Sequence, residues 1–387
     1  FVDIGWIRVN NQQIDLNITL QERWYIIPRI KIKTEEENIN AWVENMNFGH
    51  ISALFSITDE NFRGFHEQIS ITGSLGFNQS IGIKYLRPSI FGINTLGGGA
   101  EIQYTRNKEA LFGLFDYKPR YYLNSSDPLI STFQATMMVY FRPTLAIDEL
   151  LSVTYAHYLF NDTLQWINHY YYPEKSMDIL RVTSKLKFDY RNNKAYPLKG
   201  TYYDLILEKT FNLNPSLTRI NYAAFTINAR WFGKLGRRSY AALGITASTS
   251  SSSEYLFPFG FRIGQSGLEI RSFEQVQIPV TSLAIGRTTF KYQILKRDKQ
   301  KIHFFENPKF ALIHYALYAT IFADGAFADY QRALNYEQST YLKNSWLSAM
   351  GCGFDFSTYY DLVIRTEYSY NFAFRKYYFC VHFKAAI

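Results

Sequence analysis

The sequence predicts an all-β protein: a 16-stranded antiparallel transmembrane β-barrel with a long loop inserted in its lumen. The chain is 18% aromatic, with 31 Tyr and 32 Phe, which is more than soluble domains usually carry. Its mean hydropathy is −0.19, and it has no run of about eighteen apolar residues, so a spanning helix is not expected. Apolar and polar residues alternate with a period of two through most of the chain, as in barrel strands flanked by aromatic girdles.

The charge of the chain argues against nucleic acid as a partner, and its cysteine count argues against a disulfide-stabilised fold. The formal net charge of +8 is moderate, and the 41 Lys and Arg form no basic stripe, so nucleic acid is not an expected partner. A positive lumen or anionic outer-membrane lipids would use the excess. Two cysteines are too few for a disulfide framework. Without an initiator Met or a leader segment, we expect a processed or partial product.

The first 30 residues are expected to lie outside the barrel, which would occupy residues 31–387. Residues 13–20 alternate like a strand and are followed by Glu22, Arg23 and Pro28. A terminal strand without a special role is an equally good interpretation of this stretch.

From about residue 48 onward, sixteen segments read as strands of roughly ten residues, the length of a tilted strand in a bilayer. An even number permits an antiparallel barrel with both chain ends on one side. The segments are 48–57, 67–75, 80–87, 98–106, 111–121, 131–141, 149–159, 179–190, 200–210, 219–232, 238–247, 283–295, 311–324, 345–356, 361–371 and 375–384.

The two faces of these strands differ in chemistry. In residues 219–232, one face carries Ala223, Phe225, Ile227, Ala229 and Trp231, and the other carries Thr226, Asn228 and Arg230. A soluble sandwich also alternates, but such apolar faces in water would cost about 25 cal/mol per Å². Lipid outside and water or a plug inside removes that cost. The same parity places Cys352 toward lipid and Cys380 toward the lumen, which argues against a disulfide.

Two connections are long, residues 248–279 and 296–308. Long loops without periodicity are usually functional or disordered. We expect the first to enter the lumen and to hold Arg271 there. Asp324 ends a strand on its inward face, so the two could form a bidentate ion pair. The alternative, favoured by pattern alone, is that both are solvated.

Four motifs carry a family resemblance. Residues 263–273 resemble the Val-Arg-Gly-Phe/Tyr loop of the outer-membrane insertase superfamily, the BamA, TamA and FhaC type with its bacterial surface antigen domain. Residues 321–326 resemble its Phe-x-Asp-x-Gly strand, and residues 188–200 its Asp-x-Arg…Pro-x-x-Gly hairpin. Residues 59–65 are similar to its Asn-Leu-x-Gly turn. The four occur in the order of the family.

The resemblance implies a set of site residues. Its lumen loop anchor would comprise Arg271, Ser272, Phe273, Gly267, Asp324 and Gly325, and its hairpin motif Asp189, Arg191, Pro197 and Gly200. Ser272 stands where the family has glycine. Thr289 stands where the family often has a second acid, so Arg271 is expected to have one acid partner. Residues 1–30 would be the tail of a polypeptide-transport-associated (POTRA) domain.

Catalytic constellations are poor. The seven histidines form no metal-spaced pair, and no Gly-x-Ser-x-Gly elbow occurs. Residues 97–99 are three glycines without the Lys-Ser/Thr of a phosphate loop. We therefore expect no enzymatic activity, no metal and no cofactor.

The function implied is assembly or insertion of outer-membrane proteins through a lateral seam between the first and last strands. An open seam would template a client strand by β-augmentation. The partners would be unfolded client barrels and accessory subunits in the bacterial outer membrane. Alternatives are a two-partner-type secretion pore, a membrane anchor for an upstream enzyme domain, and a porin or lipid-modifying barrel. The expected seam residues are Ile51, Ala53, Phe55 and Ile57 with Tyr377, Phe379, Val381 and Phe383.

Overall fold

A computed structural model describes most of the chain. The described residues are 2–8, 10, 13–20, 25–34, 51–76, 78–124, 127–169, 172–214, 221–251, 261–264, 268–274, 276–301, 312–329, 342, 345–358 and 362–382. Helix α2 (Asp162–Ile167) spans six residues. No helix in the described part of the chain is long and apolar enough to cross a membrane.

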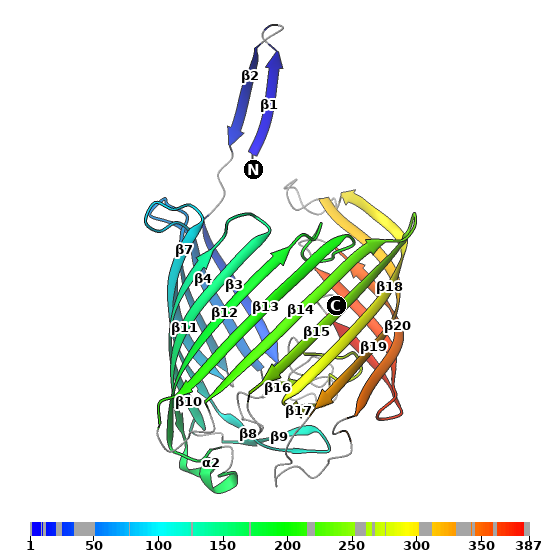
Figure 1. The fold of residues 1–387 in the computed structure, drawn as a ribbon. Helices are drawn as coiled ribbons and strands as arrows, with labels where there is room; N and C mark the ends of the chain where they lie inside the picture. Colours follow the sequence, from blue (N-terminus) through cyan, green and yellow to red (C-terminus); the bar gives the residue numbers. More distant parts are fainter. Residues whose placement is uncertain are drawn as a thin grey trace.

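One antiparallel sheet of 16 strands dominates the fold and curves into a cylinder (Figure 1). This confirms the predicted all-β class and the predicted number of strands. Its strands, in chain order, are β3 (Ile26–Thr34), β4 (Ile51–Phe62), β5 (Glu67–Gly76), β6 (Gln79–Arg87), β7 (Leu96–Asn107), β10 (Ile130–Phe141), β11 (Ile147–Phe160), β12 (Ser176–Asp189), β13 (Gly200–Asn212), β14 (Tyr222–Lys234), β15 (Ser239–Ser250), β18 (Ser282–Lys301), β19 (Leu312–Asp329), β20 (Trp346–Ser357), β21 (Val363–Asn371) and β22 (Lys376–His382).

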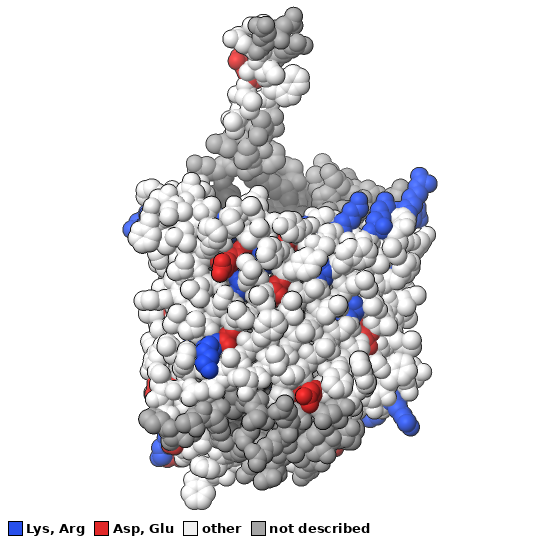
Figure 2. Space-filling view, in the orientation of Figure 1, with Lys and Arg blue, Asp and Glu red and all other residues white. Residues whose placement is uncertain are grey.

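Alternation along the strands separates an apolar outer face from an inner face that is polar except at positions of β18, β19 and β20 such as Leu283, Ala326 and Leu347. In β21, Arg365 and Glu367 are buried, whereas Tyr368 is exposed on the outside. Of the two cysteines, Cys352 is exposed and Cys380 is buried, as their parity predicts. Most of the wall seen in Figure 2 is free of charged atoms, and a group of Lys and Arg side chains projects from its upper right rim.

The predicted number of wall strands is correct, but two assignments were wrong. Residues 111–121 were predicted as a wall strand and are not one, whereas β3 is a wall strand that was not predicted. The first strand of the sheet is β3, which pairs with β4 over its whole length, so the expected boundary at residue 30 falls inside a barrel strand. Residues 111–121 form no wall strand. They belong to a separate hairpin of β8 (Glu109–Phe115) and β9 (Lys118–Leu123), which lies across one end of the cylinder (Figure 1).

The turn of the β8–β9 hairpin explains that error. Asp116 and Tyr117 have φ of 50° and 60°, the left-handed values that a two-residue hairpin turn requires. The usual sequence signal for such a turn is Asn-Gly or Asp-Gly. Asp-Tyr carries no such signal, so the hairpin reads as one continuous strand.

Two further connections differ from expectation. β18 continues to Lys301, so the start of the predicted loop at 296–308 is strand. At the N-terminus, β1 (Val2–Arg8) and β2 (Ile14–Leu20) form a two-stranded hairpin that stands apart from the cylinder (Figure 1).

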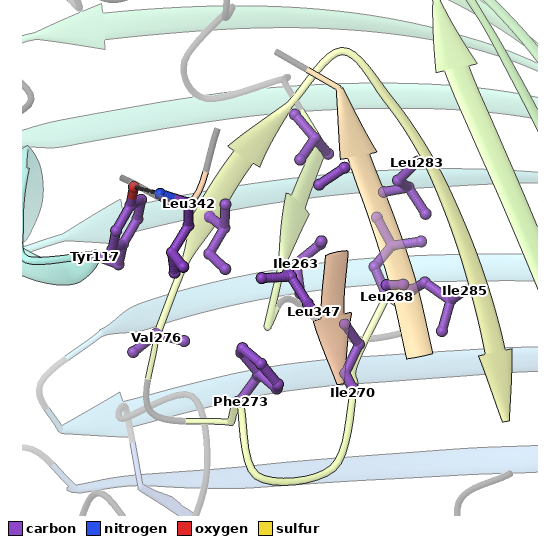
Figure 3. Packing of buried hydrophobic residues seen from close by; sticks show 14 of the residues in the cluster. Tyr117, Ile263, Leu268, Ile270, Phe273, Val276, Leu283, Ile285, Leu342 and Leu347 are labelled. Atoms are coloured by element: carbon purple, nitrogen blue, oxygen red, sulfur yellow. Dashed lines mark hydrogen bonds between the residues drawn. The ribbon is translucent and has the colours of Figure 1, made fainter. Parts of the chain in front are cut away.

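The lumen contains the largest part of the apolar core. β16 (Phe261–Ile263) and β17 (Ile278–Val280) pair with each other and frame the lumen loop, residues 261–280. Side chains of this loop pack against the inner faces of β18, β19 and β20 (Figure 3). We call this group the lumen cluster: Tyr117, Ile263, Leu268, Ile270, Phe273, Val276, Ile278, Val280, Leu283, Ile285, Ala326, Ala328, Leu342, Leu347 and Ala349.

The β8–β9 hairpin supports the lumen loop. Gln277 donates its backbone N–H to the Tyr117 carbonyl at 2.7 Å. The Tyr117 hydroxyl accepts the Leu342 N–H at 2.9 Å (Figure 3). The hairpin therefore joins the loop to a segment that precedes β20.

Candidate functional site: the anchor of the lumen loop

Arg271 on the lumen loop meets Asp324 on β19. Its Nε donates to Asp324 Oδ2 at 2.8 Å, and its Nη2 donates to Oδ1 of the same carboxylate. The Arg271 backbone N–H also reaches Oδ2, at 3.2 Å. The side chains are 8% and 0% exposed, so this is a buried bidentate pair rather than a solvated one. The structure thus brings together the arginine and aspartate that the sequence singled out.

The rest of the guanidinium is also surrounded. Nη1 donates to Thr289 Oγ1 at 3.1 Å, and Nη2 to the Thr288 carbonyl at 3.1 Å. The ring of Phe322 lies 3.8 Å from the guanidinium carbon, in cation–π geometry. Glu367 Oε1 lies 3.7 Å from Nη1. The expectation of a single acid partner was therefore wrong: the second carboxylate comes from β21 and not from the position of Thr289 on β18.

Ser272 occupies the place of the family glycine and adopts the glycine conformation, with φ of 70°. Its hydroxyl donates to Ser369 Oγ, and its carbonyl accepts from Asn371 Nδ2 at 2.9 Å. These bonds to β21 hold a backbone that costs a non-glycine residue about 1–2 kcal/mol. Compared with glycine, serine strains the backbone at this position, but its hydroxyl makes a hydrogen bond to the wall that glycine could not make.

The remaining anchor residues have different surroundings. Phe273 is fully buried in the lumen cluster and packs on Phe374, with ring centroids 5.8 Å apart. Gly325 lies in β19 beside Asp324 and pairs with Gly286. Gly267 lies outside the described residues.

A second buried ion pair, which the sequence did not single out, lies on β20 and β21. Arg365 Nε donates to Asp355 Oδ1 at 2.7 Å, and Nη2 to Oδ2 at 3.0 Å. Arg365 Nη1 lies 3.5 Å from Glu367 Oε1, so Glu367 connects this pair to Arg271. Arg365 and Glu367 are two residues apart on β21 and therefore share its inner face, but parity alone carries no signal for their pairing.

The β12–β13 connection enters the lumen and contacts this second pair. Tyr196 is buried, and its hydroxyl donates to Asp355 Oδ2 at 2.8 Å. Lys291 Nζ lies 4.2 Å over the Tyr196 ring. The wall is therefore tied both to the lumen loop and to the turn that joins β12 to β13.

The hairpin motif forms a compact structure at the base of that turn. Arg191 donates from Nε and Nη2 to the two oxygens of Asp189, each at 2.8 Å, and it covers the Tyr202 ring at 4.5 Å. Hydrogen bonding to Asp189 raises the pKa of Arg191 above its ordinary value. Pro197 is buried. The motif thus fixes the turn that presents Tyr196.

Gly200, the last residue of the motif, tests this interpretation. Its φ is 104°, and a Cβ there would lie 2.1 Å from the Tyr190 carbonyl oxygen. We expect Gly200→Ala to destabilise the barrel by about 2–3 kcal/mol, because both backbone strain and a clash with main chain are introduced. Urea unfolding in detergent measures this. Gly236→Ala, where a Cβ would meet nothing nearer than 3.8 Å, is the matched control; equal effects of both changes would contradict the proposed role.

The expected seam residues lie on β22, which is an edge of the sheet, and on β4, which is not. Tyr377 and Phe379 project outward from β22, an edge of the sheet, and Val381 lies on the same strand. Ala53, Phe55 and Ile57 are exposed on β4, which pairs with both β3 and β5. Ile51 begins β4, and Phe383 lies outside the described residues. The placement of the first edge at β4 was therefore wrong, because the edge is β3.

Comparisons with known proteins agree on the fold. No protein-family model matches the sequence, and no curated protein sequence matches it. Among solved structures, BamA from Haemophilus ducreyi lacking POTRA domains 1–3 is similar at a TM-score of 0.60 and 12% identity, over 99% of this chain and 74% of that chain. CdiB from Escherichia coli has a TM-score of 0.57 at 8% identity, over 99% of this chain and 66% of that one. CdiB from Acinetobacter baumannii has a TM-score of 0.51 at 10% identity, over 100% and 66%.

The chain thus spans about two thirds to three quarters of these structures. Likeness at such low identity concerns architecture. The matched part includes the 16-stranded sheet and the loop within it. The chain has the β-barrel fold of BamA and CdiB.

Proposed function

We propose that this protein is an integral outer-membrane barrel that assembles other β-barrel proteins, acting at a lateral seam between β3 and β22. Unfolded client barrels would be its substrates, with accessory subunits as partners and outer-membrane lipids around it. The mechanism needs no covalent chemistry. The observation that carries the proposal is the sheet order, which starts at β3 and ends at β22, with no ladder joining these two strands in the described ranges.

One edge strand favours a weak seam. β3 contains Pro28, which has no N–H to donate and is tolerated chiefly on edge strands. An edge with a missing donor pairs weakly, yet its free backbone groups can still accept a client strand.

The filled lumen supports a lateral route over an axial one. The lumen cluster lies across the interior, and the β8–β9 hairpin covers one end. Each large apolar side chain in such a cluster contributes about 1.5–3 kcal/mol by being buried. A chain passing along the axis would have to displace the loop, whereas a chain entering at the seam would not.

A covalent lock tests the seam. Cysteines introduced by Ile30→Cys in β3 and Phe379→Cys in β22, in a Cys352→Ser/Cys380→Ser background, would be joined by a short bis-maleimide. We expect the locked protein to lose at least about tenfold in the rate at which it inserts a client barrel into liposomes, because the edges can no longer part. Insertion is followed by the appearance of the folded, heat-modifiable client on gels.

The control locks two strands that have no reason to separate. Phe354→Cys and Thr366→Cys lie opposite each other on β20 and β21. Equal insertion by the seam-locked protein and its uncrosslinked form would exclude the lateral mechanism. A loss in both locks would point to general damage, and the seam assignment would then fail as well.

A secretion pore is the second candidate, favoured by the likeness to CdiB. In that case the lumen loop would leave the interior to let one partner pass. Deletion of the residues from Arg271 to Gln277 should then open a large steady conductance in planar bilayers, and the seam lock should leave transport of the partner unchanged. Deletion of the loop would open the lumen of an insertase as well, so the seam lock is the test that separates the two candidates: it should stop client insertion by an insertase and leave transport through a pore unchanged.

A further inference from the structure

Three side chains meet inside the barrel near the edge strand β22: Glu274, Cys380 and His382. None of them forms an ion pair with Arg271. Cys380 and His382 are two residues apart on β22, so both point into the lumen. Glu274, on the lumen loop, faces them. Its carboxylate, the thiol sulfur and an imidazole nitrogen all lie within 4.8 Å of one another. The loop and the strand are about a hundred positions apart in sequence, and folding alone brings them together.

Their spacing fits a tetrahedral metal ion. Zinc binds thiolate at about 2.3 Å and imidazole or carboxylate at about 2.0–2.2 Å, which places ligand atoms of a tetrahedron about 3.5 Å apart. Here Cys380 Sγ lies 3.8 Å from Glu274 Oε2, and His382 Nε2 lies 3.6 Å from Glu274 Oε1. The thiol sulfur and the imidazole nitrogen lie within 4.8 Å of each other, so side-chain adjustments of about 1 Å or less would bring all three atoms to ligand spacing.

The surroundings also favour a cation. Glu274 and Cys380 are 9% and 3% exposed. His382 Nε2 is shielded from solvent. A second carboxylate, Glu367, has Oε2 3.3 Å from this nitrogen, at ion-pair distance. A buried thiol, an imidazole and two carboxylates form a site of mixed soft and hard donors, which suits zinc better than magnesium or calcium.

We propose that Glu274, Cys380 and His382 bind one zinc ion, with water or Glu367 as the fourth ligand. Binding would release the proton of the Cys380 thiol to solvent, because the thiolate is the ligand. The ion would join the lumen loop to the edge strand β22. This site is independent of the proposed insertase activity, because it follows from the three side chains alone.

Metal binding is tested on the full chain in detergent micelles. After treatment with a chelator and gel filtration, zinc chloride is added in competition with a chromophoric chelator. We expect one equivalent to bind, and Cys380→Ser, His382→Gln and Glu274→Gln each to weaken binding by at least about tenfold, since each removes a ligand. Cobalt chloride is the spectroscopic probe and should give a thiolate-to-cobalt charge-transfer band that Cys380→Ser abolishes.

The matched controls make the same three kinds of substitution, Cys to Ser, His to Gln and Glu to Gln, at positions outside the proposed site. Cys352→Ser, His66→Gln and Glu149→Gln change exposed residues and should leave zinc affinity unchanged. Heat-modifiability of every variant shows whether the barrel is folded. In the Cys352→Ser background the single remaining thiol is Cys380, so zinc should also slow its alkylation, read by mass spectrometry.

Three results would overturn the site. The first is no bound zinc at micromolar free metal in the folded wild-type protein. The second is binding that survives Cys380→Ser or His382→Gln. The third is binding that depends on those two residues but survives Glu274→Gln, because the link between loop and strand would then be absent.

Discussion

Asp324→Asn is expected to lower the free energy of unfolding of the barrel by about 3–5 kcal/mol. The change keeps the size of the side chain but removes the charge that balances Arg271, which is 8% exposed. Removing one partner of a buried pair leaves the other charge uncompensated in a medium that solvates it poorly. Glu367, at 3.7 Å, reduces the loss without replacing the bidentate bonds. Urea titration in detergent and loss of heat-modifiability measure the effect.

Two further variants make this prediction specific. Asp148→Asn removes a carboxylate whose partners, Arg142 and Lys187, are 55% and 32% exposed, so its cost should stay below about 1 kcal/mol. The double variant Arg271→Met/Asp324→Leu should be less destabilised than the sum of its single changes, because it leaves no unpaired charge. Unchanged stability in Asp324→Asn would remove the anchor from the account of this fold.

Arg365→Met is expected to have an effect of the same size, about 3–5 kcal/mol. Arg365 and Asp355 are 1% and 0% exposed, and the change leaves Asp355 with the Tyr196 hydroxyl as its remaining hydrogen-bond donor among those described above. It also removes one of the two arginines beside Glu367. The loss should therefore spread to the Arg271 end of the network, and amide hydrogen exchange of β20 and β21 should accelerate.

Two further variants show whether the stability of the barrel depends on the positive charge of Arg365 or on its two parallel hydrogen bonds to Asp355. Arg365→Lys keeps the charge and should recover part of the stability, but it cannot make the two parallel bonds to Asp355. Lys84→Met breaks an ion pair with Glu101 in which both side chains are about a third exposed, and it should cost little. If Arg365→Met leaves the barrel as stable as the wild-type protein, the second pair is incidental to the fold.

Much of the wall could be predicted from sequence because lipid and lumen impose opposite chemistries on alternate residues. The inward positions of Tyr318, Phe322 and Asp324 follow from parity alone, and the structure places each of them inside. β3 was missed although Ile30 and Ile32 alternate with Arg29, Lys31 and Lys33, and the strand contains Pro28. Proline is excluded from central strands but not from an edge, and position in the sheet cannot be read locally.

The anchor could be predicted only in part. Arg271 and Asp324 were paired through a resemblance, since a loop without periodicity gives no direction for its side chains. The contribution of Glu367 and the meeting of Glu274 with Cys380 depend on how deeply the loop enters the lumen. Cys380 and His382 did carry a readable signal, because a Cys-x-His pattern places both donors on one face of a strand. Their third partner is set by the tertiary structure alone.

The bonds between the lumen loop and β21 or β22 have a consequence for the order in which the protein folds. Ser272 and Ser369 are 97 residues apart, and Glu274 and Cys380 are 106 apart. Contacts of such high sequence separation form late, because the entropy of closing the intervening chain must be overcome before any contact is gained. Before the last two strands are in position, the loop can therefore contact only β18, β19 and β20, and its bonds to β21 and β22 are the last of its contacts to form.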